Sequence, residues 1–188
     1  MKTIDTALPG VVVLEPDVRV DDRGFFVELW HEARYEAIGV RGPFIQDNLS
    51  HSRKGVLRGL HLQWPNAQGK LVVVPHGEVF DVAVDVRRGS PTFGRWIGTV
   101  LSGMNHRQLW IPPGFAHGFA VLSEGATVQY KTTAPYVPQD EVTVAWDDPA
   151  IGIEWPLTAP LMSPRDAAAP RLAEVDEARL PTFFPLLR

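Results

Sequence analysis

The chemically versatile residues of this sequence gather in and around the string Arg58-Gly59-Leu60-His61-Leu62-Gln63, where polar groups interrupt an otherwise apolar run. Lys70 opens the next apolar run, and Tyr130 lies in a later one. Polar groups inside a sheet are costly unless they pair with each other or with a ligand. A cation, an imidazole, an amine and a phenol together suit an anionic ligand and a proton transfer. Taken alone, the strand also fits a simpler interpretation, a buried histidine beside a surface arginine.

The spacing within this string bears on which side chains can share a site. By strand alternation His61 and Gln63 lie on one face, and Arg58 points to the other. A bulge at Gly59 would turn Arg58 toward the face of His61. We therefore expect an irregularity at Gly59 if Arg58 and His61 serve one ligand.

Several familiar kinds of site are excluded by the residues present. The chain has no cysteine, so disulfides, thiolate metal sites and cysteine nucleophiles are ruled out. Glycine-rich phosphate loops and a G-x-S-x-G elbow are absent as well. Jelly rolls that bind metal usually carry two histidines one residue apart, but His61 is followed by Leu62-Gln63. We expect no metal and no cofactor.

These residues must be positioned by strands. Short apolar or alternating runs recur about every ten residues between Gly, Pro, Asn and Asp clusters, which predicts an all-β, double-sheet jelly roll. Short helices are expected near the ends, at 31–38, closed by Gly39, and at 174–180. In Val79–Arg87 the even positions are apolar and Asp81 lies on the polar face. The expected strands are 11–14, 25–30, 56–63, 71–74, 79–86, 96–101, 108–111, 119–122, 127–131 and 142–146.

Length and charge limit the classes of partner. The 188 residues suffice for one domain, so we expect a single jelly-roll domain over 1–188. A net charge of −4 does not suit a nucleic-acid-coating protein. No apolar run approaches the ~20 residues of a membrane helix, and Met1–Gly10 lacks a signal-peptide core. A cytoplasmic location without nucleic-acid or membrane partners is the expectation.

Many ordered motifs resemble one enzyme family, the dTDP-4-dehydrorhamnose 3,5-epimerases. The similarity runs from about residue 9 to residue 170. The family is a metal-free cupin-type jelly roll that works as a dimer, so the resemblance implies that fold, a homodimer and a dTDP-linked 4-keto-6-deoxyhexose substrate. The strings that carry it are Asp22-Arg23-Gly24-Phe25-Phe26-Val27-Glu28, Gln46-Asp47-Asn48-Leu49-Ser50, Gly55–Gln63, Gly69-Lys70-Leu71-Val72, Phe80–Asp85, Gly89–Gly94, Gln108–Pro112, Gly114–Phe119, Ile151–Pro156 and Arg165–Pro170.

The resemblance also implies roles for five residues in catalysis. The protons at C3 and C5 lie alpha to the C4 ketone, so their removal gives an enolate and needs a base and an acid. His61 corresponds to the base, which Asp166 would orient, and Tyr130 to the acid on the opposite face. Lys70 would stabilise the enolate oxygen, with Asp81 orienting Lys70.

The remaining implied residues bind the nucleotide and the sugar. Arg58 and Arg23 would hold the diphosphate, with Arg23 reaching across from a partner subunit. Where some relatives carry an arginine, this chain has Val73, which lowers the local charge. The other implied contacts are Phe26, Glu28, Gln46 and Asn48 at the nucleotide, Tyr136 near the sugar, His117 at the pocket floor and Arg165 near the phosphates.

Three alternatives remain open at this point. A 5-epimerase or 3-epimerase of antibiotic deoxysugar synthesis would keep His61 and Tyr130 and place the sugar differently, around Tyr136. A metal-dependent sugar isomerase would need the second histidine that is missing here. A non-catalytic sugar-nucleotide binding protein would not need an acid–base pair.

Overall fold

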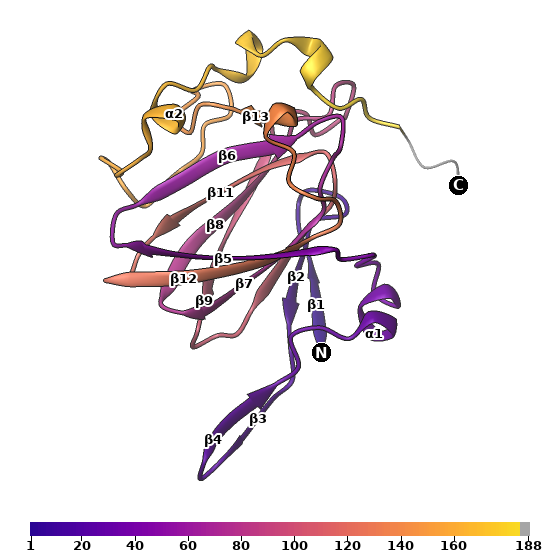
Figure 1. The fold of residues 1–188 in the computed structure, drawn as a ribbon, viewed down its shortest axis with the longest axis vertical. Coiled ribbons are helices and arrows are strands. Elements are labelled where there is room, and N and C mark those ends of the chain that lie inside the picture. Colours follow the sequence, from indigo (N-terminus) through magenta and orange to yellow (C-terminus); the bar gives the residue numbers. More distant parts are fainter. Residues whose placement is uncertain (185–188) are drawn as a thin grey trace.

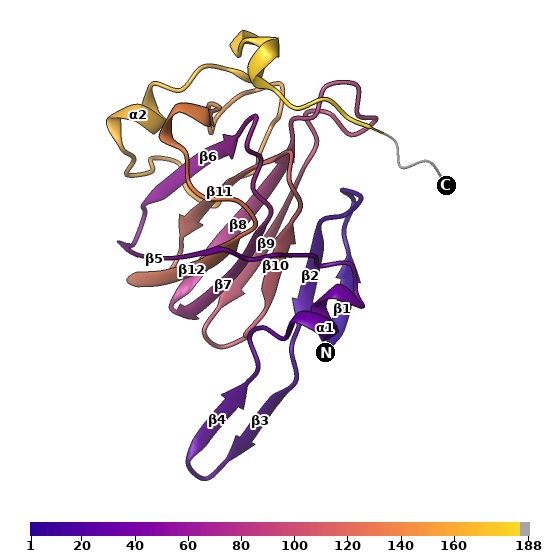
Figure 2. The same cartoon turned by 45° about the vertical axis from the view of Figure 1, so that its right-hand side comes forward.

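Two antiparallel sheets stack to form the body of the molecule, which a computed structural model describes over residues 1–184. Figure 1 shows the two layers, and Figure 2 shows them after a turn of 45°. The first sheet has the spatial order β1 (Lys2–Asp5), β2 (Val12–Glu15), β10 (Gln108–Ile111), β7 (Lys70–His76), β12 (Gly125–Thr132) and β5 (Gln46–Arg53). The second has the order β13 (Glu141–Thr143), β6 (Leu57–Gln63), β11 (Phe115–Val121), β8 (Glu78–Asp85) and β9 (Trp96–Ser102). The predicted all-β double-sheet jelly roll is confirmed.

The interior between the sheets is filled by the inward positions of the strands. Val72 and Val74 of β7 and Val128 of β12 meet Ala83 of β8 and Phe115 of β11 in one buried cluster. Because successive side chains of a strand point to opposite faces, the residues between these positions point outward. This apolar packing sets which residues can face a site inside the barrel.

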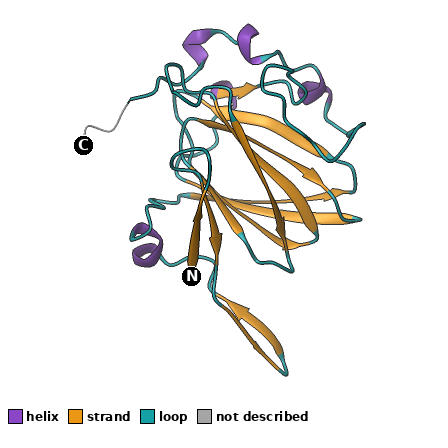
Figure 3. Ribbon diagram, turned by 180° about the vertical axis from the view of Figure 1, so that it is seen from behind, coloured by secondary structure: helices purple, strands orange, loops and turns teal. Residues whose placement is uncertain are grey.

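The outer faces of both sheets are covered too. Helix α1 (Glu32–Glu36) buries Tyr35 against Leu71 and Trp110 on the six-stranded sheet. On the five-stranded sheet, the C-terminal segment packs Leu172 and Leu180 against a second apolar layer (Figure 3). The central strands β7, β10, β8 and β11 therefore have apolar residues on both faces, as fully buried strands do.

The ends of the chain hold short helices, as predicted, although one of them differs in form. Helix α1 lies within the expected range 31–38 and ends before Gly39, which has a φ of 86°. The expected helix at 174–180 is wrong. Two 3₁₀ turns, Leu172–Glu174 and Glu177–Arg179, flank an extended Val175, whose side chain is drawn into the outer apolar layer.

Strand β8 also corrects the expectation for its polar face. Asp81 is fully buried on the inner face with Val79 and Ala83, while Val82 and Val84 pack on the outer layer. The face with charged residues is thus the one that looks into the barrel. This arrangement is possible because Asp81 has a buried partner there, described below.

A hairpin of β3 (Val18–Asp21) and β4 (Gly24–Val27) extends away from the stacked sheets (Figures 1 and 2). Phe25 and Phe26 on this hairpin are exposed, at 59% and 69%. Within residues 1–184, no helix is long and apolar enough to cross a membrane.

Candidate active site

A cavity of about 720 Å³ opens between the two sheets, beyond the apolar interior. Side chains of both sheets and of the segment that carries helix α2 (Pro164–Ala167) line it. Among the residues proposed from the sequence, the lining includes Gln46, Asn48, Arg58, His61, Lys70, His117, Tyr130, Tyr136, Arg165 and Asp166.

Strand parity explains why the polar groups meet here. Lys70 shares the inner face of β7 with Val72 and Val74, and Tyr130 shares that of β12 with Val128. The same inward rows that build the apolar interior therefore end in polar residues at the cavity.

A bulge brings Arg58 to the face of His61, as the sequence predicted. In the pairing of β6 with β11, His61 lies opposite His117 but Arg58 lies opposite Phe119, so β6 has one extra residue. Gly59 has a φ of 116°, and a Cβ there would lie 2.6 Å from the Cα of Gly118. Only glycine fits this close approach of the two strands.

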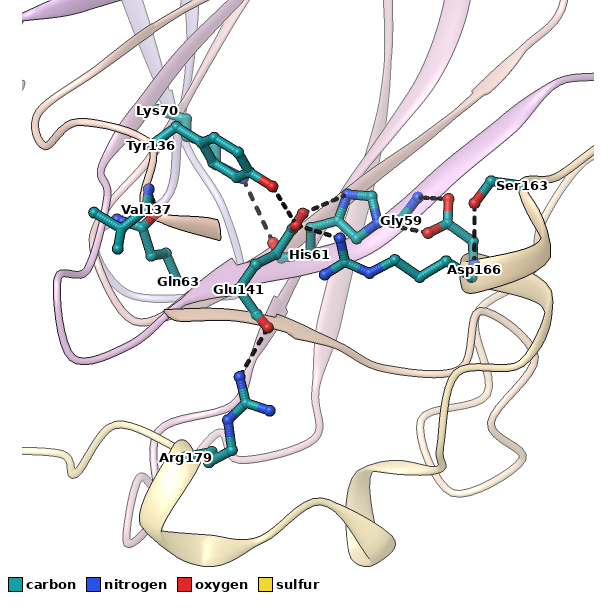
Figure 4. Close-up of polar contacts among 11 residues, drawn as sticks. Gly59, His61, Gln63, Lys70, Tyr136, Val137, Glu141, Ser163, Asp166 and Arg179 are labelled. Carbon is teal, nitrogen blue, oxygen red and sulfur yellow. Dashed lines mark hydrogen bonds and ion pairs between the residues drawn. The ribbon is translucent and has the colours of Figure 1, made fainter. Parts of the chain in front are cut away.

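His61 is held by a carboxylate from a distant part of the chain. Its Nε2 lies 2.8 Å from Oδ1 of Asp166, on helix α2 (Figure 4). Ser163 caps this short helix by accepting from the Asp166 amide, and Pro164 begins it, which fixes where Asp166 points. Burial alone would raise the pKa of Asp166, but His61 and the Gly59 N–H hold that pKa below its ordinary value.

The ionised Asp166 determines which imidazole nitrogen can act as a base. A carboxylate only accepts hydrogen bonds, so Nε2 of His61 donates its proton to Asp166. In the neutral ring Nδ1 then carries the lone pair. Its nearest acidic neighbour is Oε1 of Glu141 at 3.9 Å, which is beyond hydrogen-bond length.

Glu141 is the centre of a second polar cluster beside His61. Its Oε2 accepts from the Tyr136 hydroxyl at 2.7 Å and from Nη1 of Arg165 at 2.5 Å (Figure 4). Burial opposes ionisation, but these two donors and His61 hold the pKa of Glu141 below its ordinary value. The hydrogen bond that the Tyr136 hydroxyl donates to Glu141 raises the pKa of Tyr136.

Lys70 is a buried amine for which residues 1–184 provide one weak hydrogen bond. Its Nζ lies 3.5 Å from the carbonyl oxygen of His61, and the residue is 9% exposed. Burial lowers the pKa of Lys70 to about 8, against the attraction of Glu141 and Asp81. An ammonium group held in this way is available to an oxyanion in the cavity.

Asp81 contacts a partner other than the expected one. Both of its oxygens lie 3.0 Å from Nε2 of His117, and the pair is buried. Asp81 does not line the cavity, whereas His117 does. The structure therefore places Asp81 behind His117, where it holds that imidazole in orientation, and not on Lys70.

Tyr130 faces the cavity from the sheet opposite to that of His61. It lies on β12 beside Asn48 of β5 and Val72 of β7, and it packs against the interior cluster. Burial raises the pKa of Tyr130, so its hydroxyl keeps its proton at neutral pH.

Cations and amides line another stretch of the cavity wall. Nε of Arg58 donates to Oγ of Ser52 at 3.0 Å, which fixes the side chain. Arg53, which the sequence analysis did not single out, also lines the cavity. Gln46 and Asn48 lie on inward positions of β5 and are hydrogen-bonded to each other at 2.8 Å.

Besides Asp81, three proposed residues lie outside the cavity. Arg23 is at the turn of the projecting hairpin, paired with Asp21, and its side chain is 90% exposed. Phe26 and Glu28 line a separate hollow between this hairpin and α1. Within one subunit the structure does not bring these three to His61.

Over the described range 1–184, no three His, Asp or Glu side chains gather in a way that could hold a metal ion.

Glu141 was not predicted as a site residue from the sequence, although the alternation of side chains in its strand indicates where it points. Val142 and Val144 both pack on the outer layer, so Glu141 and Thr143 occupy the opposite face of β13. The predicted strand began one residue too late, at Val142, and thus excluded the glutamate. Gln63 was noticed but not proposed, because its partners Pro135 and Val137 lie far along the chain.

The comparison with known proteins decides the family. A family profile described as dTDP-4-dehydrorhamnose 3,5-epimerase matches residues 5–174. The chain belongs to this family. A relative from Salmonella typhimurium that bears the same name is 57% identical over 175 residues, which is 92% of this chain and 96% of the relative.

Two further comparisons agree. A Neisseria gonorrhoeae dTDP-4-dehydrorhamnose 3,5-epimerase is 55% identical over 181 residues; these cover 96% of this chain but only 55% of that longer protein. A crystal structure of the Legionella pneumophila epimerase, in complex with dTDP-4-keto-L-rhamnose, superposes with a TM-score of 0.95 at 51% identity. That match covers 97% of this chain and 98% of the other. The fold of this chain is that of the family's enzymes.

Proposed function

We propose that this enzyme epimerises dTDP-4-dehydro-6-deoxy-D-glucose at C3 and C5 to give dTDP-4-dehydro-L-rhamnose. The observation that carries the proposal is the pairing of His61 Nε2 with Asp166, which leaves Nδ1 as a base in a cavity shared with Lys70 and Tyr130. The names of relatives more than 50% identical support the substrate.

In this proposal the base is His61. Nδ1 takes the proton from C3 or C5, each alpha to the C4 ketone, and the ring becomes a cation that Asp166 stabilises through Nε2. The electron pair moves onto the C4 oxygen, and the ammonium of Lys70 stabilises the resulting enolate.

Inversion requires that the new proton arrive on the other side of the sugar ring. Tyr130 projects from the six-stranded sheet, and His61 from the five-stranded sheet. A sugar bound between the sheets would meet the base on one face and the phenol on the other. Tyr130 then donates the proton, and inversion at C3 and C5 needs one such cycle at each carbon.

The rest of the substrate would be held by charge and by amides. Arg58, and with it Arg53, binds the diphosphate, since guanidinium groups suit phosphate oxygens. Gln46 and Asn48 contact the nucleotide. Tyr136, Arg165 and His117 line the remainder of the cavity, where the sugar and the adjoining phosphate would lie.

We also propose a homodimer in which the hairpin of one subunit completes the site of the other. Arg23, Phe26 and Glu28 cannot serve the cavity of their own chain, and the hairpin projects with exposed phenylalanines. Burial of such apolar area is a common driving force for association. The mass in solution, measured by ultracentrifugation, would contradict this if it were that of a monomer at micromolar concentration.

The test of the function is the reaction in D₂O with EDTA present. Starting from dTDP-4-dehydro-6-deoxy-D-glucose, we expect deuterium at both C3 and C5 of the product and the L-rhamno configuration by NMR. Deuterium and inversion at one carbon only would identify a single-site epimerase instead. A reaction that stops in EDTA and resumes with zinc or manganese would contradict the metal-free mechanism.

The pH dependence of kcat/KM should report Lys70. The pKa of Lys70 is lowered to about 8, and its charged form stabilises the enolate, so activity should fall as the pH rises through about 8. Tyr130, with a raised pKa, does not titrate there. In Lys70→Arg, whose guanidinium keeps its charge, this decline should be absent from the residual activity. A decline that persists near pH 8 in the variant would assign it to another group.

A further inference from the structure

Residues 135–141 form a strap that leads from β12 to β13 and carries two of the cavity's side chains, Tyr136 and Glu141. One end of the strap is tied to the strand of the base. The side chain of Gln63 donates to the Pro135 carbonyl at 2.9 Å and accepts from the Val137 amide at 2.7 Å. The Tyr136 amide donates to Oε1 of Gln46 at 2.8 Å.

The other end of the strap is tied by a residue from the C-terminal segment. Nη2 of Arg179 donates to the carbonyl of Glu141 at 2.9 Å (Figure 4) and to that of Gln139 at 3.3 Å. Strand β13 has three residues and lies at the edge of its sheet, so its outer side has no neighbouring strand. Short edge strands open easily, and Arg179 ties the first residue of β13 and the turn before it by hydrogen bonds to one carbonyl of each.

Arg179 is well anchored although its own side chain is exposed. It ends the 3₁₀ turn Glu177–Arg179, and Leu180 after it is 3% exposed within the outer apolar layer that also contains Val142. The turn is thus fixed to the same sheet as β13. Arg179 lies beyond residue 174, where the match to the family profile ends.

We propose that Arg179 is a positioning residue, which keeps Glu141 and Tyr136 beside Nδ1 of His61 by holding the edge of β13. The inference rests on the function proposed above. If the edge opens, the carboxylate of Glu141 moves away together with Tyr136 and Arg165, which it binds. The sugar is then held less often in the geometry for proton transfer, while the phosphate-binding wall at Arg58 is unaffected.

The test compares three variants, Arg179→Ala, Arg179→Lys and Glu177→Ala. Glu177 lies in the same turn and contacts Arg88, not the strap, so its removal controls for loosening of the C-terminal segment. Hydrogen–deuterium exchange of residues 135–143 is measured without substrate, and kcat, KM and the Kd of dTDP are measured separately.

We expect Arg179→Ala to exchange residues 135–143 roughly tenfold faster and to lose roughly 5- to 20-fold in kcat, with a much smaller change in the Kd of dTDP. Arg179→Lys, which can still donate to both carbonyls, should recover most of both losses. Glu177→Ala should match the wild type.

Two results would overturn the inference while the wild type remains an active epimerase. One is wild-type exchange in the strap of Arg179→Ala. The other is an equal loss of kcat in Glu177→Ala, which would indicate a general effect of the C-terminal segment. An inactive wild type would instead refute the proposed function, and the exchange measurement would still decide whether Arg179 holds the strap.

Discussion

His61→Ala should lower turnover by at least a hundredfold, which corresponds to about 3 kcal/mol or more in activation free energy. The variant removes the imidazole that pairs with Asp166, and the neighbouring carboxylate of Glu141 is already bound by Tyr136 and Arg165. Without proton abstraction no enolate forms. Deuterium incorporation from D₂O at C3 and C5, followed by NMR, should therefore fall together with turnover.

A matched control is His51→Ala, because His51 is an exposed residue of β5 that contacts Thr127 and does not line the cavity. This control should leave turnover unchanged. The affinity of His61→Ala for dTDP should be close to that of the wild type, since Arg58 supplies the diphosphate contact. Near-wild-type turnover in His61→Ala would refute the assignment of the base.

Tyr130→Phe should separate proton exchange from inversion. The base is intact, so an enolate can form, but the donor on the opposite sheet is gone and the proton returns from the side of His61. We expect substrate that gains deuterium with its configuration retained, while product formation drops by two to four orders of magnitude. NMR of the recovered substrate and of the product in one sample measures both quantities.

The comparison within that sample provides the control, because exchange and inversion are counted on the same molecules. An equal loss of exchange and inversion would show that Tyr130 helps to form the enolate. Unchanged inversion would show that the second proton comes from another group.

Much of the site could be predicted from polar residues that interrupt or border the apolar runs of the sequence. His61, Lys70 and Tyr130 each interrupt or border an apolar run, and the structure places all three on inward positions at one cavity. The interior packs the apolar members of these strands tightly, so parity alone determines where the polar members point.

Some strands were not predicted from the sequence because they lack a row of apolar residues. Strand β5 reads QDNLSHSR, because its inner row faces the cavity and its outer row faces solvent, and neither row needs to be apolar. Strands β1 and β3 are mostly exposed and were missed for the same reason. Hydrophobic periodicity detects a buried face, and these strands have none.

Contacts between distant segments could not be derived from local pattern at all. Asp166 lies 105 residues after His61 in a four-residue helix, and its role came only from the resemblance to the family. The resemblance implied that Asp81 orients Lys70, but the Asp81 carboxylate is hydrogen-bonded to His117 across the β8–β11 pairing. Which inward groups become partners depends on strand order, and strand order cannot be read from one strand.

Because of the bulge at Gly59, the geometry of the site depends on the number of residues in β6 relative to its neighbour β11. Arg58 and His61 are three positions apart, which in a regular strand would put them on opposite faces, yet both face the cavity because β6 has one residue that its neighbour β11 does not match. Regular pairing of β6 with β11 at an unchanged residue count would remove the bulge and put Arg58 and His61 on opposite faces, so that one of the two side chains would leave the cavity. Side chains around this cavity can therefore be exchanged one at a time, but the extra residue of β6 and the bulge at Gly59 can be gained or lost only together.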